Sequence, residues 1–120
     1  MRKITLSDAE WKLMDKLWEE SYLTITEMTE RMKEETAWDK HTIITMLGRM
    51  EKKGAVSYRQ KGRAKEFYPL ISREKASTEE TKKFLERVYH GSLSLMLCQI
   101  MKKQTLTEEE KEMLKKMLEE

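Results

Sequence analysis

Hydrophobic residues in the first half of this chain recur every three to four positions, which is the spacing of amphipathic helices. Ser7–Glu10 and Thr24–Glu27 each fit a capping box, in which a hydroxyl and a glutamate satisfy free N–H groups that begin a helix. Asp39 is a suitable N-cap for a third helix, which we expect to end at Lys53 and Gly54. Each helix then has an apolar face for a shared core, formed by Trp11, Met14, Leu17 and Trp18, by Ile25, Met28 and Met32, and by Ile43, Met46, Leu47 and Met50.

Beyond Gly54 the hydrophobic period changes from that of a helix to that of a strand. Residues 55–60 and 65–70 carry apolar side chains in the pattern of strands, and residues 61–64 between them form a polar turn with a glycine. Pro69 near the end of the second strand is typical of an edge strand that is finishing. The pattern therefore predicts a β-hairpin with a basic tip.

Three more helices are predicted after the hairpin, over about residues 73–90, about residues 92–103 and from a third capping box at Thr107–Glu110. The middle helix is apolar almost all round and must be covered on several sides. These helices have no large core of their own to join, so we expect a second copy of the chain to cover them. The residues expected at this dimer interface are Phe84, Val88, Leu93, Met96, Leu97, Ile100, Met101, Leu114, Met117 and Leu118.

A chain of 120 residues has room for one compact head and a short accessory element. Three helices followed by a hairpin form the winged-helix arrangement, a relative of the helix-turn-helix whose third helix enters the major groove of DNA. We therefore predict a mainly α fold with a small β-hairpin. A winged helix-turn-helix head is expected over residues 1–71, and a three-helix dimerisation region over residues 72–120.

Positive charge is concentrated in one segment, although the net charge of the whole chain is only +2. Residues 1–39 hold six basic and ten acidic side chains, whereas residues 40–65 hold eight basic side chains and one acidic one, a local excess of +7. Residues 71–120 are neutral, with ten side chains of each sign. Such an excess suits a polyanion, although a solvated lysine-rich face would also account for the charge alone.

The predicted third helix and hairpin carry this excess on surfaces that suit DNA. Small or polar side chains lie near the N-terminal end of the helix, opposite its apolar face, and cations lie toward its C-terminal end, where phosphates are expected. Gly48 in mid-helix fits either a close backbone approach or a tolerated surface glycine. The basic turn can follow the DNA backbone or enter the minor groove. The predicted DNA contacts are Lys40, His41, Thr42, Ile44, Thr45, Arg49, Lys52, Arg59, Lys61, Arg63 and Lys65.

Other functional classes lack the residues that they need. His41 and His90 lie far apart with no thiol beside them, so we predict no metal site and no cofactor. We interpret the single cysteine, Cys98, as a small buried hydrophobe. No nucleophile lies near either histidine in the sequence and no phosphate-binding glycine loop occurs, so an enzyme is not expected. The main alternative to a DNA-binding protein is a winged helix that contacts another protein without binding DNA.

The longest apolar run in the sequence, Leu93–Cys98, is interrupted by Ser94. It is far shorter than the ~18 to 20 residues that a membrane-spanning helix needs. We therefore expect a cytoplasmic protein without membrane insertion.

Several stretches together resemble the penicillinase and methicillin-resistance repressor family, which also includes copper-responsive repressors. They are Leu6–Trp18 (LSDAEWKLMDKLW), Thr42-Ile43 to Arg49-Met50 with Lys52-Lys53-Gly54, Gly62-Arg63-Ala64 to Tyr68-Pro69-Leu70, and Thr81–Leu85 (TKKFL) to Gly91. The resemblance covers nearly the whole chain and implies a homodimeric repressor of a resistance or transport operon. It implies binding to double-stranded DNA at a short inverted repeat of TACA/TGTA type. In the β-lactam branch, it implies a membrane sensor protease pathway that relieves repression through cleavage in the helical tail.

Three features depart from the pattern of that family. The chain has no C-terminal CxCxxxxCxC motif, which excludes copper sensing by that route. The β-lactam members are cut at an Asn-Phe bond, and the matching bond here is Gln99-Ile100. Ile44 stands where those members often have arginine, so the preferred operator is expected to differ in a base or two.

Overall fold

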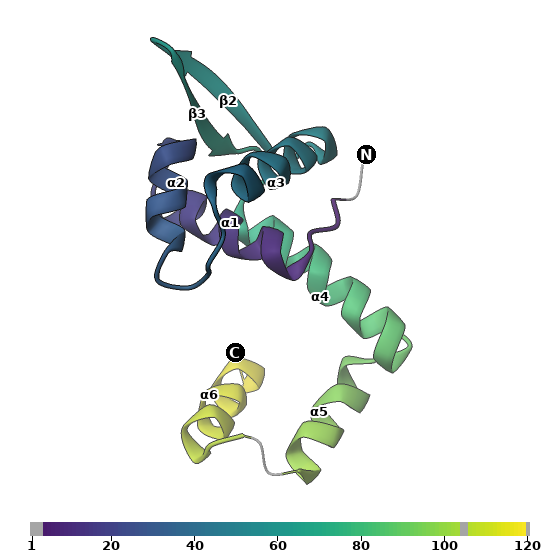
Figure 1. Cartoon of the computed structure of the whole chain (residues 1–120). Coiled ribbons are helices and arrows are strands. Elements are labelled where there is room, and N and C mark those ends of the chain that lie inside the picture. The colour runs from purple at the N-terminus through teal and green to yellow at the C-terminus, as the bar shows by residue number, and fades with distance from the viewer. Residues whose placement is uncertain (1–3, 104–105, 120) are drawn as a thin grey trace. The chain divides into compact units, whose positions relative to one another are not determined.

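The computed structural model describes residues 4–103 and 106–119, and the chain divides into two compact units, residues 1–79 and residues 80–120 (Figure 1). The first unit holds α1 (Asp8–Glu19), β1 (Leu23–Thr24), α2 (Ile25–Met32), α3 (Lys40–Lys53), β2 (Val56–Lys61), β3 (Ala64–Pro69) and the start of α4 (Arg73–Tyr89). The second unit holds the rest of α4 with α5 (Leu93–Lys102) and α6 (Glu108–Glu119). The predicted mainly α fold with a small β-hairpin is confirmed.

Local hydrogen bonds begin and end the helices where the sequence predicts. Reciprocal capping boxes begin α1 at Ser7 and α2 at Thr24, and Thr107 makes the same pair of bonds with Glu110 at the start of α6. Gly54 ends α3 with a φ of +82°, in the left-handed region where a glycine is favoured. The three capping boxes and the cap at Gly54 are therefore confirmed.

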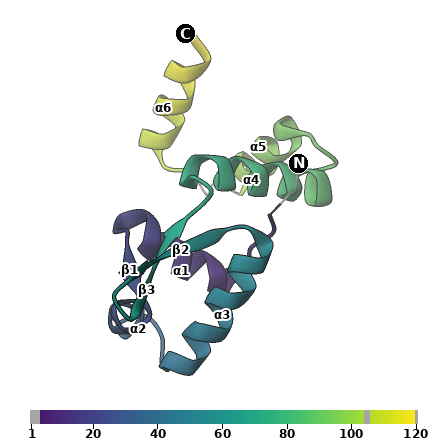
Figure 2. The same ribbon diagram turned by 90° about the horizontal axis from the view of Figure 1, so that it is seen from above.

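A small antiparallel sheet of order β1-β3-β2 completes the first unit (Figure 2). Lys61 pairs with Ala64, so the turn of the hairpin contains only two residues, Gly62 and Arg63, rather than the predicted four. The φ of Gly62 is +63°, as required at the first central position of a type II′ turn, whose twist matches that of the strands. The short strand β1 was not predicted, because two residues show no period.

The expectation that Pro69 lies on an edge strand is wrong. β3 is the central strand, since β1 pairs with it on one side and β2 on the other. β1 pairs only with Glu66 and Phe67, so the ladder on that side has already ended where Pro69 lies opposite Val56. The missing N–H of proline is tolerated there because no neighbour on the β1 side needs it.

The core of the first unit joins the three helices to the sheet. Its fully buried side chains are Leu13, Met14, Leu17, Leu23, Met28, Met32, Ile43, Leu47, Met50 and Val56. Four residues predicted for the core are only half-buried and pack against its margin, namely Trp11, Trp18, Ile25 and Met46. The indole N–H of Trp18 donates a 2.9 Å hydrogen bond to the carbonyl of Ile71, so its polar group is satisfied in this half-buried position.

The first turns of α4 pack on the head. Ala76 is buried, and the guanidinium of Arg73 lies 3.6 Å from the Asp15 carboxylate and 5.2 Å from the ring centre of Trp18. These contacts extend the first compact unit to residue 79. The domain boundary predicted between residues 71 and 72 stays a prediction.

A partly buried ion pair joins the end of α3 to the start of α1. The ammonium group of Lys53 contacts the carboxylate of Glu10, and it also donates a 2.9 Å hydrogen bond to the carbonyl of Thr5. Burial alone would raise the pKa of Glu10, but hydrogen bonds from Lys53 and Ser7 hold this pKa below its ordinary value of 4.5. Glu10 is therefore charged at neutral pH although its side chain is only 4% exposed.

We predict that Lys53→Met lowers the free energy of unfolding by about 1–3 kcal/mol at neutral pH, because the Glu10 carboxylate is left buried without its partner. Since the folded-state pKa of Glu10 is lowered, its contribution is present above pH 4.5 and is lost as the pH falls through the folded-state pKa. Urea unfolding should therefore show a smaller difference between variant and wild type in acid than at neutral pH. An equal difference at both pH values would contradict this account.

Candidate nucleic-acid interface

Helix α3 separates its buried face from an exposed one as the sequence predicts. Ile43, Leu47 and Met50 lie in the core. The opposite face is exposed over the length of the helix and carries His41, Thr45, Gly48, Arg49 and Lys52. Because the buried residues fix the rotation of α3 about its axis, small and polar groups face solvent at its N-terminal end and cations face solvent toward its C-terminal end.

Hydrogen bonds at the start of α3 fix its N-terminal side chains. One carboxylate oxygen of Asp39 accepts from both the backbone N–H and the hydroxyl of Thr42, each at 2.9 Å. These bonds hold the pKa of Asp39 below its ordinary value, and the nearby charge of His41 adds to the effect. The hydroxyl of Thr45 donates to the carbonyl of His41 at 3.1 Å, so its oxygen remains available as an acceptor.

Two residues on the exposed side of α3 have no polar side chain. Ile44 is 45% exposed, although it is a large apolar residue on a mostly polar face. An exposed aliphatic group at this position suits the methyl group of a thymine in the major groove. Apart from its chain neighbours and the backbone of α3 itself, no described atom lies within 4 Å of the place that a Cβ would take at Gly48, so no packing contact requires a glycine there.

A groove of about 460 Å³ lies between the start of α1 and the exposed face of α3. It is lined by Ser7, Ala9, Glu10, His41, Thr42, Thr45, Met46, Arg49 and Lys53. Four of the predicted contacts, His41, Thr42, Thr45 and Arg49, therefore share one concave surface.

The four contacts predicted on the hairpin lie in different surroundings. Arg63 lies in the exposed two-residue turn and makes no ion pair among the described residues. Lys61 and Lys65 are exposed on the strands beside it, and the ammonium group of Lys65 lies 4.3 Å from the ring centre of Tyr58. Arg59 lies farther from the turn, where its guanidinium contacts Glu66 at 3.0 Å and lies 3.4 Å from the ring centre of Tyr22.

Glu66 and Tyr22 were missed as partners of Arg59 in the sequence. A hairpin centred between Gly62 and Arg63 places residues 59 and 66 opposite each other, so the register was a signal that could have found Glu66. Tyr22 lies in a different part of the sequence and carries no comparable signal.

The second unit leaves most of its predicted interface residues at the surface. Phe84, Val88, Leu93, Met101, Met117 and Leu118 are exposed, and Met96, Leu97, Ile100 and Leu114 are half-buried. Neither α5 nor α6 has a buried side chain within the described residues. The interpretation of Cys98 as a buried hydrophobe is wrong for this single chain, because none of the described residues buries its side chain, which is exposed.

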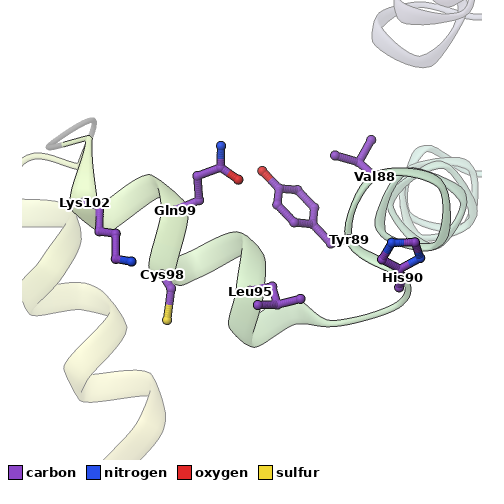
Figure 3. Close-up of a pocket in the computed structure, with 7 residues that line it drawn as sticks. All are labelled: Val88, Tyr89, His90, Leu95, Cys98, Gln99 and Lys102. Carbon is purple, nitrogen blue, oxygen red and sulfur yellow. The ribbon is translucent and has the colours of Figure 1, made fainter.

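A shallow pocket of about 400 Å³ lies between the end of α4 and α5 (Figure 3). It is lined by Val88, Tyr89, His90, Leu95, Cys98, Gln99 and Lys102. Tyr89 and Gln99 point toward each other across it. At the predicted cleavage bond, the side chain of Gln99 is exposed and that of Ile100 is half-buried, and both residues lie inside α5.

The described residues contain neither a metal-binding cluster nor a membrane-spanning helix. Over residues 4–103 and 106–119, no group of three or more His, Cys, Asp or Glu residues could hold a metal ion. In the same part of the chain, no helix is both long enough and apolar enough to cross a membrane.

Three helices, a three-stranded sheet and a hairpin with arginine at its turn define a winged helix-turn-helix module, with α3 in the position of the recognition helix. Comparison with known proteins then places the chain within this class. The penicillinase repressor family matches residues 6–120, and the chain belongs to this family. The family consists of transcriptional repressors, not of enzymes.

Individual relatives resemble the chain over most of its length. The penicillinase repressor of Bacillus licheniformis is 33% identical over 121 residues, which span 100% of this chain and 94% of the relative. The methicillin resistance regulatory protein MecI of Staphylococcus aureus is 26% identical and covers 94% of this chain and 92% of the relative. The solution structure of monomeric Bacillus licheniformis BlaI with the blaP half-operator has a TM-score of 0.54 and 35% identity, over 62% of this chain and 92% of the other.

We predict that Asp39→Ala lowers the free energy of unfolding by about 1 kcal/mol, because α3 loses the side chain that caps its N-terminus. Asp39→Asn is the matched control, since asparagine removes the same charge but is an equally good N-cap. Urea unfolding of the two variants should therefore show a substantial loss for alanine and little loss for asparagine. Equal losses would mean that the charge of Asp39, and not its hydrogen bonds, stabilises the helix.

Proposed function

We propose that this chain is a transcriptional repressor that binds an inverted-repeat operator as a homodimer. In this proposal the exposed face of α3 enters the major groove, and the turn of the hairpin lies along the DNA backbone. The observation that carries it is the outward face of α3, where polar side chains precede cations, combined with an exposed arginine at the hairpin turn. The binding of a half-operator by BlaI, a relative with the same head, supports it. Such a protein would act in the cytoplasm, where the operator is.

The contacts divide into two kinds in this proposal. His41, Ile44 and Thr45 near the N-terminal end of α3 reach base edges, where a hydrogen bond or an apolar contact discriminates between base pairs. The cations contact phosphates, which gives affinity and register but little sequence information. The expected phosphate contacts are Lys40, Arg49, Lys52, Lys61, Arg63 and Lys65, with Thr42 placed at the start of the helix beside them.

We predict that Arg49→Ala and Arg63→Ala weaken binding to all duplexes alike, because each removes a phosphate contact. Each should also make the negative slope of log affinity against log salt less steep by about 1. His41→Ala and Thr45→Ala should instead relax discrimination at particular base pairs, by about 1–3 kcal/mol each. Fluorescence anisotropy with single-base variants of an operator selected from genomic DNA measures both effects.

Lys12→Ala is the control for this prediction, because Lys12 is an exposed cation on α1 and lies outside the proposed interface. If the two classes of variant gave the same profile, the division into base and phosphate contacts would be wrong. If the wild-type protein were not retained on duplex DNA in a salt-dependent way, a protein-binding winged helix would replace the proposal.

The exposed apolar residues of the second unit support dimerisation. Leu93 and Met101 of α5 and Met117 and Leu118 of α6 are more than half exposed in the single chain. Large apolar side chains exposed in this number usually mark an interface, and a two-fold dimer presents two recognition helices to an inverted repeat.

We predict that Leu118→Asp shifts the protein from dimer toward monomer, because a carboxylate would be buried without a partner at the interface. Leu118 is 83% exposed in the single chain, so the substitution should leave the fold of each chain intact. Lys115→Asp adds a carboxylate to the same helix outside its apolar stripe and should leave the dimer unchanged. Sedimentation equilibrium distinguishes these results, and a wild-type protein that is monomeric at micromolar concentration would contradict the dimer.

The proposal also includes a way to end repression, which is cleavage of the chain at Gln99-Ile100. It supposes a membrane sensor protease pathway that responds to a β-lactam. A protease binds an extended segment, so this bond inside α5 must be released by local opening of the helix before it is cut. The cut would remove α6 and the end of α5, and the separated heads would lose the avidity of two half-sites.

We predict that exposing the source cells to a β-lactam produces a fragment that ends at Gln99, because the opened α5 presents this bond to the protease. Immunoblotting and mass spectrometry would identify the fragment. The paired substitution Gln99→Asn with Ile100→Phe restores the bond of the β-lactam branch and should be cut at least as fast. Full-length protein that persists while the operon is derepressed would reject cleavage.

A further inference from the structure

A cluster on one face of the sheet joins the hairpin to the segment before α2. The guanidinium of Arg59 on β2 lies between the carboxylate of Glu66 on β3 and the ring of Tyr22, which precedes β1. Tyr22 also meets Tyr68 edge to face, with ring centres 5.1 Å apart. Four side chains, from β2, from β3 and from the segment before β1, therefore share one contact network.

The cluster lies at the last point where the hairpin is supported from the side. β1 pairs with β3 only at Leu23 with Phe67 and at Thr24 with Glu66. Nearer the turn, residues 60–65 pair only within the hairpin. The direction in which the turn projects therefore depends on how firmly the strands are held at Arg59 and Glu66.

Arg59 is poorly suited to contact a phosphate itself. The side chain of Glu66 is only 12% exposed, so moving Arg59 to DNA would leave a nearly buried carboxylate without its ion-pair partner. It would also give up the stacking of the guanidinium on Tyr22. Arg63 in the turn can reach a phosphate without either loss.

We propose that Arg59 is a positioning residue of the DNA-binding wing. Its guanidinium, held between Glu66 and Tyr22, sets the direction of the hairpin so that Arg63 meets the DNA backbone. This inference rests on the proposed function, because it supposes that the hairpin binds DNA. It reassigns Arg59 from the DNA contacts predicted from the sequence to the residues that hold such contacts in place.

Glu66→Gln separates positioning from direct contact, because the two roles predict changes of opposite sign. The substitution removes a negative charge from the wing and frees Arg59. A phosphate-binding Arg59 would then bind the operator more tightly. A positioning Arg59 loses its anchor, so operator affinity should fall by about threefold to tenfold despite the gain in positive charge.

Glu20→Gln is the matched control, since Glu20 pairs with Arg31 at an exposed site outside this cluster and its loss changes the charge equally. We expect operator affinity in this control to be unchanged or slightly higher. Arg59→Lys provides a second variant that retains the charge. Lysine would preserve a point contact to phosphate, but it cannot reproduce both the Nε hydrogen bond to Glu66 and the stacking on Tyr22, so affinity should fall nearly as far as in Arg59→Gln.

A double-mutant cycle between Arg59→Gln and Arg63→Ala completes the test. If Arg59 acts through the turn, the two losses of affinity are less than additive although the side chains do not share a partner. The measurement is anisotropy with the selected operator, at a temperature where circular dichroism shows each variant folded. Tighter binding by Glu66→Gln, full rescue by Arg59→Lys, or additive losses would overturn the proposal. Failure of the proposed function is distinct, because wild type and Arg63→Ala would then bind equally or not at all.

Discussion

The burial of one face of α3 is the constraint on which the proposed interface depends. Ile43, Leu47 and Met50 occupy the core between α1, α2 and the sheet, so the helix cannot rotate without exposing them. Burying each large apolar side chain contributes about 1.5–3 kcal/mol, which exceeds what any single surface contact provides. The outward direction of His41, Thr45 and Arg49 is thus determined by the residues that face inward.

Burial in the core also fixes the start of the hairpin. Gly54 ends α3 in a left-handed conformation, and β2 begins two residues later with Val56 in the core. The hairpin is then held at its base by the core and at its middle by β1 and the cluster around Arg59. Beyond that point residues 60–65 pair only within the hairpin, which leaves a short exposed segment to meet a partner.

Much of this fold could be predicted from the sequence because its signals are local. Capping boxes at Ser7 and Thr24 involve residues three apart, and the apolar face of α3 repeats within a single helix. The misses arise where distant residues decide the outcome. β1 exists only because β3 pairs with it, and the same pairing makes the strand of Pro69 central.

The candidate site could also be predicted only in part, and for the same reason. The face of α3 followed from helical period alone, whereas the local excess of positive charge could not separate Arg63 from Arg59. Their difference depends on Tyr22 and Glu66, which only the tertiary structure brings to Arg59. In the second unit, the apolar residues of α5 and α6 were recognised, but their exposure in a single chain became visible only in the structure.

The central claim is that one surface of the head, made by the outward face of α3 and the hairpin turn, meets DNA. Titrating the ¹⁵N-labelled full chain with a selected operator duplex tests it most directly, because amide chemical shifts report contacts residue by residue. The account predicts the largest changes at His41, Thr45, Arg49 and Gly62, with α6 little affected. Changes confined to other surfaces, with α3 unperturbed, would contradict it.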